Sequence, residues 1–145
     1  MRVGKVSTDF LREQSTRLGQ NLLYPPNVKG WPGDQTWINS NTVLLRFNFA
    51  MAVTSQRQQE YVRKSELEKW LKQTGIKGAA DVVDYFALML LDGAIEPDER
   101  DKLVDFMNRG PKGESKAFAL TSESINTKIR GLLHVMMAMP EYQLA

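Results

Sequence analysis

The sequence predicts an all-α protein, a compact bundle of about six helices around an ordered loop rich in Pro and Trp. Apolar residues recur at helical spacing in successive segments, and Gly, Pro or a capping residue bounds most of these segments. No stretch of useful length shows the alternating pattern of a strand. With 145 residues, 42% hydrophobic and 25% charged, the chain is expected to form a single helical domain over residues 1–145.

The first two expected helices differ in their apolar content. One runs from a cap at residue 7 or 8 to about residue 18, where Gly19 is placed to end it, and its few apolar residues predict a surface position. The other begins at Ser40 or Asn41 and reaches about Val53. Apolar residues cover nearly its whole circumference, so we expect it to be buried on several sides.

The remaining helices follow from capping and periodicity. Ser65 and Glu68 read as a capping box ahead of a helix that Gly75 ends. A strongly apolar helix is expected over 79–91, and another from Pro97 to about residue 109. The last helix starts at residue 121 or 122 and carries an apolar stripe of Ile125, Ile129, Leu132, Leu133, Met136 and Met139. Pro140 is expected to stop it and leave a tail, and residues 110–120 are expected to form a flexible loop.

Residues 20–39 lack any helical or strand period, yet they hold two of the three Trp and three of the six Pro. Prolines restrict the backbone and the aromatic rings can bury large areas, so this loop is predicted to be ordered. We favour rings that pack as plugs on the helices, and the alternative is an exposed stacking platform. The hypothetical binding residues are Tyr24, Asn27, Trp31, Asp34, Trp37, Asn39 and Arg46.

Arg46 is the one charged residue of the second helix. A guanidinium on a buried helix needs partners, and the preceding loop offers carbonyl groups and Asp34. One hypothesis is therefore that Arg46 pins the loop to the helix. An Arg that reaches solvent from the edge of the helix explains the same residue equally well.

Two segments carry a resemblance to a known family. These are Leu18-Gly19-Gln20 with Pro25-Pro26-Asn27-Val28-Lys29-Gly30-Trp31-Pro32-Gly33 and Trp37-Ile38-Asn39, and then Leu132-Leu133-His134 with Pro140-Glu141-Tyr142-Gln143-Leu144-Ala145. The chain resembles the C-terminal part of the bacterial domain-of-unknown-function 1800 family from about Leu18 onward. Asp34 departs from the second Gly more often found there. The resemblance implies a fragment or truncated relative of longer proteins, and it implies no established reaction and no catalytic residues.

Composition excludes several classes of protein. A formal net charge of +2, from 19 basic and 17 acidic residues, argues against a nucleic-acid partner. The absence of Cys excludes disulfides and thiolate metal sites. The sequence shows no membrane span and no targeting signal after Met1, and it leaves the cellular location open.

Residues that suggest chemistry have simpler explanations. Asp92, Gly93 and Glu99 imitate part of a calcium loop, but Leu88 and Leu90 would fill its first ligand positions. His134 is the only histidine, and an exposed or interface position is expected for it. The acidic pairs Asp81 with Asp84, and Glu96 with Asp98 and Glu99, are explained by a solvated helix edge and a helix N-terminus. No catalytic residue, metal site or cofactor is therefore predicted.

The function predicted from these observations is a non-catalytic structural or interaction domain that docks through the aromatic loop. Its partner would be another protein or a missing N-terminal domain. One alternative is a carbohydrate-binding module in which Tyr24, Trp31 and Trp37 stack on sugar rings. A second alternative is part of an uncharacterised hydrolase, in which Asp34, Arg46 and His134 would have to converge.

Overall fold

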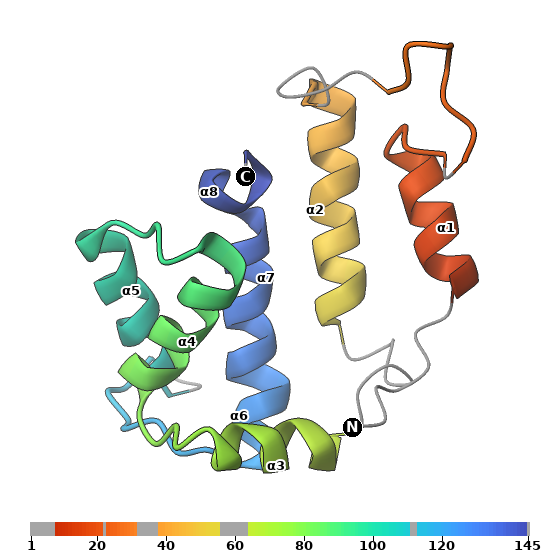
Figure 1. The fold of residues 1–145 in the computed structure, drawn as a ribbon. Coiled ribbons are helices and arrows are strands. Elements are labelled where there is room, and N and C mark those ends of the chain that lie inside the picture. The colour runs from red at the N-terminus through yellow and green to blue at the C-terminus, as the bar shows by residue number, and fades with distance from the viewer. Residues whose placement is uncertain (1–7, 22, 32–37, 56–63, 111–112, 145) are drawn as a thin grey trace. The chain divides into compact units, whose positions relative to one another are not determined.

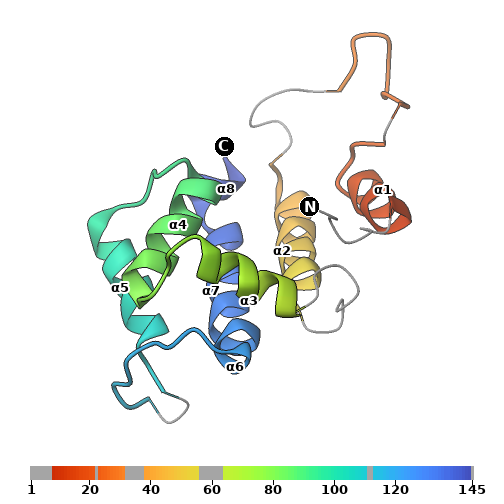
Figure 2. The same cartoon turned by 60° about the horizontal axis from the view of Figure 1, so that its bottom comes forward.

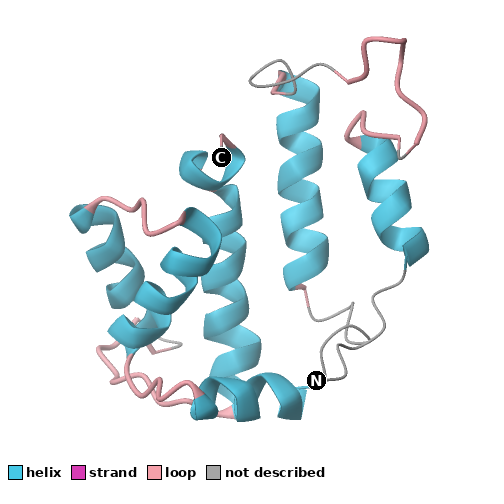
Figure 3. Ribbon diagram, in the orientation of Figure 1, coloured by secondary structure: helices cyan, strands magenta, loops and turns pink. Residues whose placement is uncertain are grey.

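The computed structural model describes residues 8–21, 23–31, 38–55, 64–110 and 113–144, with only the backbone described over 64–68. These residues form helices joined by loops, and none of them lies in a β-strand (Figure 3). The prediction of an all-α fold is confirmed. The chain divides into two compact units, Met1–Tyr61 and Val62–Ala145. That the two units belong to a single domain stays a prediction.

The N-terminal unit contains helices α1 (Thr8–Arg17) and α2 (Ser40–Thr54) among its described residues (Figure 1). The first expected helix is confirmed. It ends at Arg17, and Gly19 follows with a φ of +85°, in the left-handed region that glycine adopts without steric cost. Phe10 of α1 stacks on Phe49 of α2 with ring centroids 6.3 Å apart. This aromatic pair joins the two helices of the unit.

The prediction that the second helix is buried on several sides is wrong. Only Ala50 and Thr54 of α2 are buried. Four of its apolar side chains are exposed: Leu44 by 58%, Phe47 by 37%, Met51 by 54% and Val53 by 41%. The physical reason is that α1 is too polar to cover α2, since it contributes Phe10 to the contact while Leu11 is itself 44% exposed.

The second unit begins with three helices, α3 (Lys64–Gln73), α4 (Ala79–Leu91) and α5 (Pro97–Met107). The predicted bounds of α4 are confirmed, as is the start of α5 at Pro97. Helix α3 begins at Lys64 rather than after Ser65, and the side chains of the predicted capping box lie outside the described residues. Gly75, with φ +78°, follows α3 as expected.

The last helix is built from three consecutive segments, α6 (Ser122–Ser124), the π-helical η3 (Ile125–Ile129) and α7 (Arg130–Ala138). Its predicted start is confirmed, because Thr121 and Ser124 form a reciprocal capping box. The predicted tail is wrong in part. Pro140 opens a further short helix, α8 (Pro140–Gln143), where a proline suits the first turn. The buried Gln143 side chain anchors α8 by donating to the Met137 carbonyl oxygen at 2.5 Å.

One apolar core fills the second unit. Its α4 helix contacts both α5 and α7, and the two views in Figures 1 and 2 agree on this arrangement. The rings of Trp70 and Tyr85 pack edge to face at the border of the core, with their centroids 5.2 Å apart. The buried residues of the core are Leu71, Ile76, Ala79, Val82, Val83, Phe86, Ala87, Leu103, Met107, Ile125, Ile129, Leu132 and Met136. In the described part of the chain, no helix is both long and apolar enough to span a bilayer.

Asp81 and Asp84, predicted to share one edge of α4, have separate structural roles. The Asp81 carboxylate accepts hydrogen bonds from the backbone N–H of Gly78 at 2.9 Å and of Lys77 at 3.1 Å, ahead of the helix. These bonds hold the pKa of Asp81 below its ordinary value of 3.8. Asp84 instead forms a two-bond ion pair with Arg100 of α5, at 2.6 and 2.7 Å.

The assigned core predicts that substitution by Ala destabilises the fold more at Leu132 than at Val135, both on α7. Leu132 is 0% exposed and Val135 is 41% exposed. Leu132→Ala should lower the free energy of unfolding by about 2–5 kcal/mol, because it removes buried methyl groups and leaves a cavity. Val135→Ala, the matched control, should change it by less than about 1 kcal/mol. Urea unfolding measures both values, and equal losses at the two positions would contradict the assigned core.

The Asp81 hydrogen bonds predict a dependence of stability on pH. The pKa of Asp81 is lower in the folded chain than in the unfolded chain, so its carboxylate stabilises the fold above 3.8. That stabilisation is lost as the pH falls through the lowered pKa. The difference in unfolding free energy between wild type and Asp81→Asn should therefore shrink between about pH 6 and about pH 2.

The control for this experiment is Asp105→Asn, which changes an exposed carboxylate of α5. Its difference from wild type should vary less with pH, because the described backbone hydrogen bond to Asp105, from the Asn108 N–H, reaches its backbone carbonyl oxygen and not its carboxylate. A difference for Asp81→Asn that stays constant over the same range would show that these hydrogen bonds do not select the charged carboxylate.

Candidate functional site

The aromatic loop singled out by the sequence is described only in part, since Asp34 and Trp37 lie outside the described residues. Tyr24 is 76% exposed, and Trp31 is 36% exposed. The expectation that the rings pack as plugs is therefore wrong for Tyr24, because no described side chain covers most of its surface. Leu23 and Val28 of the same loop are exposed as well.

Asn27 has a structural part in this loop. Its side-chain oxygen accepts a hydrogen bond from the Lys29 N–H at 2.8 Å, and its carbonyl oxygen accepts one from the Gly30 N–H at 3.0 Å. Such a turn is typical of Asn, and Gly30 completes it with φ +88°. A role for Asn27 in binding stays a prediction.

Asn39 and Arg46 belong to α2 and its cap. The Asn39 side chain accepts hydrogen bonds from the N–H groups of Asn41 and Thr42, so Asn39 is the cap that was expected at Ser40 or Asn41. Arg46 is half-buried, and its Nε is buried without a hydrogen bond, although the side chain has an interaction elsewhere. Contact between Arg46 and Asp34 stays a prediction.

The other acidic and histidine side chains that could take part in catalysis or metal binding do not form a cluster in the described structure. Within the described residues, no group of three or more His, Asp or Glu side chains is arranged to hold a metal ion. Asp92 is the left-handed C-cap of α4, with φ +51°. His134 is half-buried on α7, and its Nδ1 is buried without a hydrogen-bond partner.

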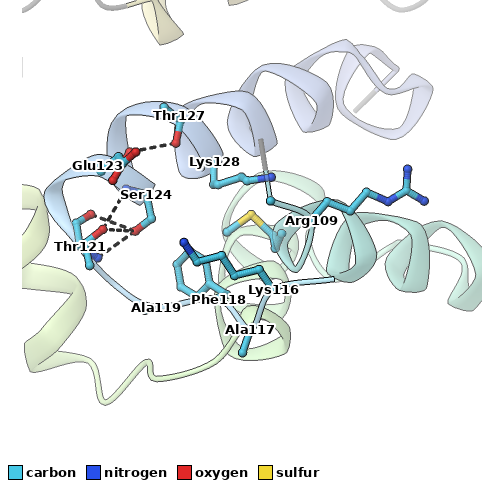
Figure 4. Close-up of a pocket in the computed structure, with 12 residues that line it drawn as sticks. Arg109, Lys116, Ala117, Phe118, Ala119, Thr121, Glu123, Ser124, Thr127 and Lys128 are labelled. Carbon is cyan, nitrogen blue, oxygen red and sulfur yellow. Dashed lines mark hydrogen bonds between the residues drawn. The ribbon is translucent and has the colours of Figure 1, made fainter. Parts of the chain in front are cut away.

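The second unit contains a basic cavity of about 190 Å³ (Figure 4). Three basic side chains and one acidic side chain line it, together with hydroxyl and apolar groups. Its lining residues are Met107, Arg109, Gly110, Lys116, Ala117, Phe118, Ala119, Thr121, Glu123, Ser124, Thr127 and Lys128. They come from the end of α5, from the loop that follows it and from the start of the last helix, so the basic cavity lies wholly inside one unit.

The loop after α5 folds back on the end of that helix. The Asn108 carbonyl oxygen accepts from the Lys116 N–H at 2.7 Å, and the Asn108 side chain accepts from the Phe118 N–H at 3.0 Å. Gly110 is buried, and a side chain at this position would displace the flexible Glu114 side chain. Residues 110–120 were expected to be flexible. Their flexibility stays a prediction, but residues 116–119 of this loop form one wall of the basic cavity.

The π-helical turn forms the opposite wall. The Arg130 N–H donates to the Ile125 carbonyl oxygen, five residues back. The side chains of Asn126 and Thr127 donate at 2.7 and 2.9 Å to carbonyl oxygens four residues back, those of Ser122 and Glu123. Such side-chain bonds compete with the α-helical pattern. Two of the residues in this turn, Thr127 and Lys128, line the cavity.

Lys128 joins the π-helical turn to α5. Its Nζ donates to the Phe106 carbonyl oxygen at 3.1 Å and lies 4.9 Å from the centre of the Phe106 ring. A carbonyl in the last turn of a helix carries partial negative charge, so an ammonium group is favoured there. The bond fixes the Lys128 side chain at one end of the basic cavity.

The other charges of the cavity have fewer partners. Lys116 and Arg109 are exposed, and neither forms an ion pair with a described carboxylate. Figure 4 shows the Lys116 side chain pointing toward Thr121, while the Arg109 guanidinium points away from the other labelled residues. Glu123 is the only carboxylate among the lining residues. The described walls therefore give the cavity a net positive charge.

The sequence reasoning missed the basic cavity. Its one signal was the polar run Asn126-Thr127-Lys128, which lies between the apolar positions Ile125 and Ile129 of the last helix. Lys116 gave no signal, because its place in the cavity depends on hydrogen bonds between the loop and Asn108.

Comparison with known proteins identifies one family. The family model described as "Protein of unknown function (DUF1800)" matches residues 1–144. The family suggested by the two sequence segments is confirmed, and the match extends ahead of Leu18. No curated protein and no solved structure matches the chain. A position at the C-terminal end of longer relatives stays a prediction.

The bond between Lys128 and α5 predicts that Lys128 contributes more to the stability of the fold than Lys116 does. Lys128→Met removes the hydrogen bond to Phe106 and the contact with its ring, and should lower the free energy of unfolding by about 1–2 kcal/mol. Lys116→Met, the matched control, removes an exposed ammonium and should change it by less than about 0.5 kcal/mol. Guanidinium unfolding measures both, and a larger loss for Lys116→Met would contradict the assigned contacts.

Proposed function

This chain belongs to the family described as protein of unknown function (DUF1800), and from that premise we propose that it is a non-catalytic interaction domain. The proposed docking face is the set of apolar side chains Leu44, Phe47 and Met51 on α2. The aromatic loop of the same unit exposes further side chains, those of Leu23, Tyr24 and Val28. The observation that carries the proposal is the exposure of an apolar helix that the described residues of its unit leave uncovered.

Helical spacing places the three side chains of the docking face on one side of α2. Leu44, Phe47 and Met51 stand at i, i+3 and i+7, which is the spacing of a single helix face. Burying such a side chain stabilises a complex by about 1.5–3 kcal/mol. A helix that is apolar around its whole circumference normally packs against other protein on several sides. Docking would supply the cover that the unit lacks.

The occupant of this face is a protein surface with apolar side chains and little charge. Arg46 is the only charged residue between Ser40 and Thr54, and the docking face itself contains no charged side chain. A charged partner would lose hydration there without gaining an ion pair. An apolar helix face of another protein, or of a further domain joined to this chain, fits this chemistry best.

Carbohydrate binding is a second candidate, and the exposure of Tyr24 favours it. An exposed ring three residues before Asn27 offers a stacking surface with a polar side chain nearby in sequence, and sugar sites combine these two kinds of group. Trp37, the third ring of that hypothesis, lies outside the described residues. No described arrangement favours the hydrolase alternative, since Asp34 is outside the described residues and Arg46 and His134 belong to different units.

The docking proposal predicts what a double substitution does to the isolated chain. Wild type should bind the apolar dye 8-anilinonaphthalene sulfonate in its folded state, and Leu44→Glu/Met51→Glu should lose most of that fluorescence. The thermal midpoint should stay nearly unchanged, because substitution of exposed side chains costs about 0.5 kcal/mol or less. Dye titration and a circular-dichroism melt measure the two effects.

Ala50→Glu is the matched control, because Ala50 lies on the same helix and is only 1% exposed. It should unfold the first unit by burying a charge. Unfolding of the double variant would show that the face is core rather than a docking surface. Association of wild type that the double variant abolishes in sedimentation velocity would identify a second copy as the occupant. A shift of Trp fluorescence with a soluble polysaccharide would favour the carbohydrate candidate.

A further inference from the structure

We propose that the basic cavity of the second unit binds a small oxyanion, of the size and charge of phosphate. The site consists of the Lys116 and Lys128 ammonium groups over a floor formed by Met107 and Phe118. It is independent of the proposed docking face, because all of its residues belong to Val62–Ala145 and the docking face belongs to Met1–Tyr61.

The hydrogen-bond donors of the cavity are its lysines. The hydroxyl protons of Thr121, Ser124 and Thr127 are already donated to protein oxygen atoms. An ammonium group has three protons, and Lys128 uses one of them on the Phe106 carbonyl oxygen. Lys116 makes no ion pair with a described carboxylate, so its protons remain available to a ligand. Donors of this kind favour an anion over a neutral or cationic ligand.

The two ammonium groups approach the cavity from different sides. In Figure 4 the Lys116 ammonium points toward the Thr121 end, and the Lys128 ammonium points toward the Arg109 end. Lys128 is held in place by Phe106, so part of the entropic cost of ordering a binding side chain is already met. Lys116 is exposed and can close on a ligand from the mouth.

The size of the cavity limits the ligand. A volume of about 190 Å³ is smaller than the roughly 300–1,000 Å³ of pockets that hold drug-sized molecules. Inorganic phosphate or a single phosphate or carboxylate group of a larger molecule is therefore the class that the cavity accommodates. Glu123 opposes such a ligand, because its carboxylate lines the same cavity.

The test is a titration of the full chain with inorganic phosphate at pH 7 and constant ionic strength, followed by calorimetry and by amide NMR shifts. Wild type should bind saturably, with shifts centred on Lys116, Ser124 and Thr127. Lys116→Gln should weaken binding about fivefold or more by removing one charge-assisted contact. Glu123→Gln should tighten binding, because it removes the opposing carboxylate.

Lys102→Gln is the matched control, since Lys102 is an exposed lysine of the same unit that lies outside the cavity lining. It should leave phosphate binding unchanged. The proposal is overturned if wild type does not bind phosphate saturably, or if the Lys102 and Lys116 variants weaken binding equally. It is also overturned if Glu123→Gln does not tighten binding. Lys116→Gln leaves the Phe106 contact of Lys128 intact, so a loss of binding in this variant does not reflect unfolding.

Discussion

The burial of the last helix is the interaction on which the second unit depends. Ile125, Ile129, Leu132 and Met136 are all 0% exposed, and the segments that carry them contact α4 and α5. Each such side chain contributes about 1.5–3 kcal/mol when it leaves water, which offsets the entropy lost on ordering the chain. The α5 end, the loop after it and the basic cavity all take their positions from this packed segment.

The first unit is held together by helix capping and one aromatic contact, with little burial of apolar side chains. Its α2 helix has capping by Asn39 and an aromatic contact between Phe49 and Phe10, but only Ala50 and Thr54 are buried. Local capping contributes about 1 kcal/mol, which is far less than a packed apolar face provides. The same apolar sequence that forms the helix therefore leaves it in need of cover. This need links the folding of the unit to the docking that we propose for it.

The sequence predicted the helices whose signals lie in neighbouring residues. It did not predict burial and cavities, because these depend on contacts between residues that are far apart in the chain. The bounds of α4 and the stripe from Ile125 to Met136 followed from apolar spacing, which the structure confirms. The burial of α2 did not follow, because an apolar circumference shows a capacity for packing and not whether a partner is present. The basic cavity was missed since Lys116 and Lys128 lie apart in sequence. They line the same cavity because Asn108 holds the loop that carries Lys116 and the Phe106 carbonyl oxygen holds Lys128. The short helix at Pro140 was missed because proline both ends one helix and opens another.

The uneven burial of methionine has a consequence for oxidation. The chain has no Cys, so its seven Met are its only sulfur atoms. Met51 on the proposed docking face is 54% exposed and Met89 on α4 is 57% exposed, whereas Met107 and Met136 in the core are 1% and 0% exposed. Sulfoxide formation follows exposure and turns an apolar side chain into a polar one. A mild oxidant would therefore convert Met51 and Met89 before it reached the core, and would make the proposed docking face more polar while the buried core of the second unit stayed intact.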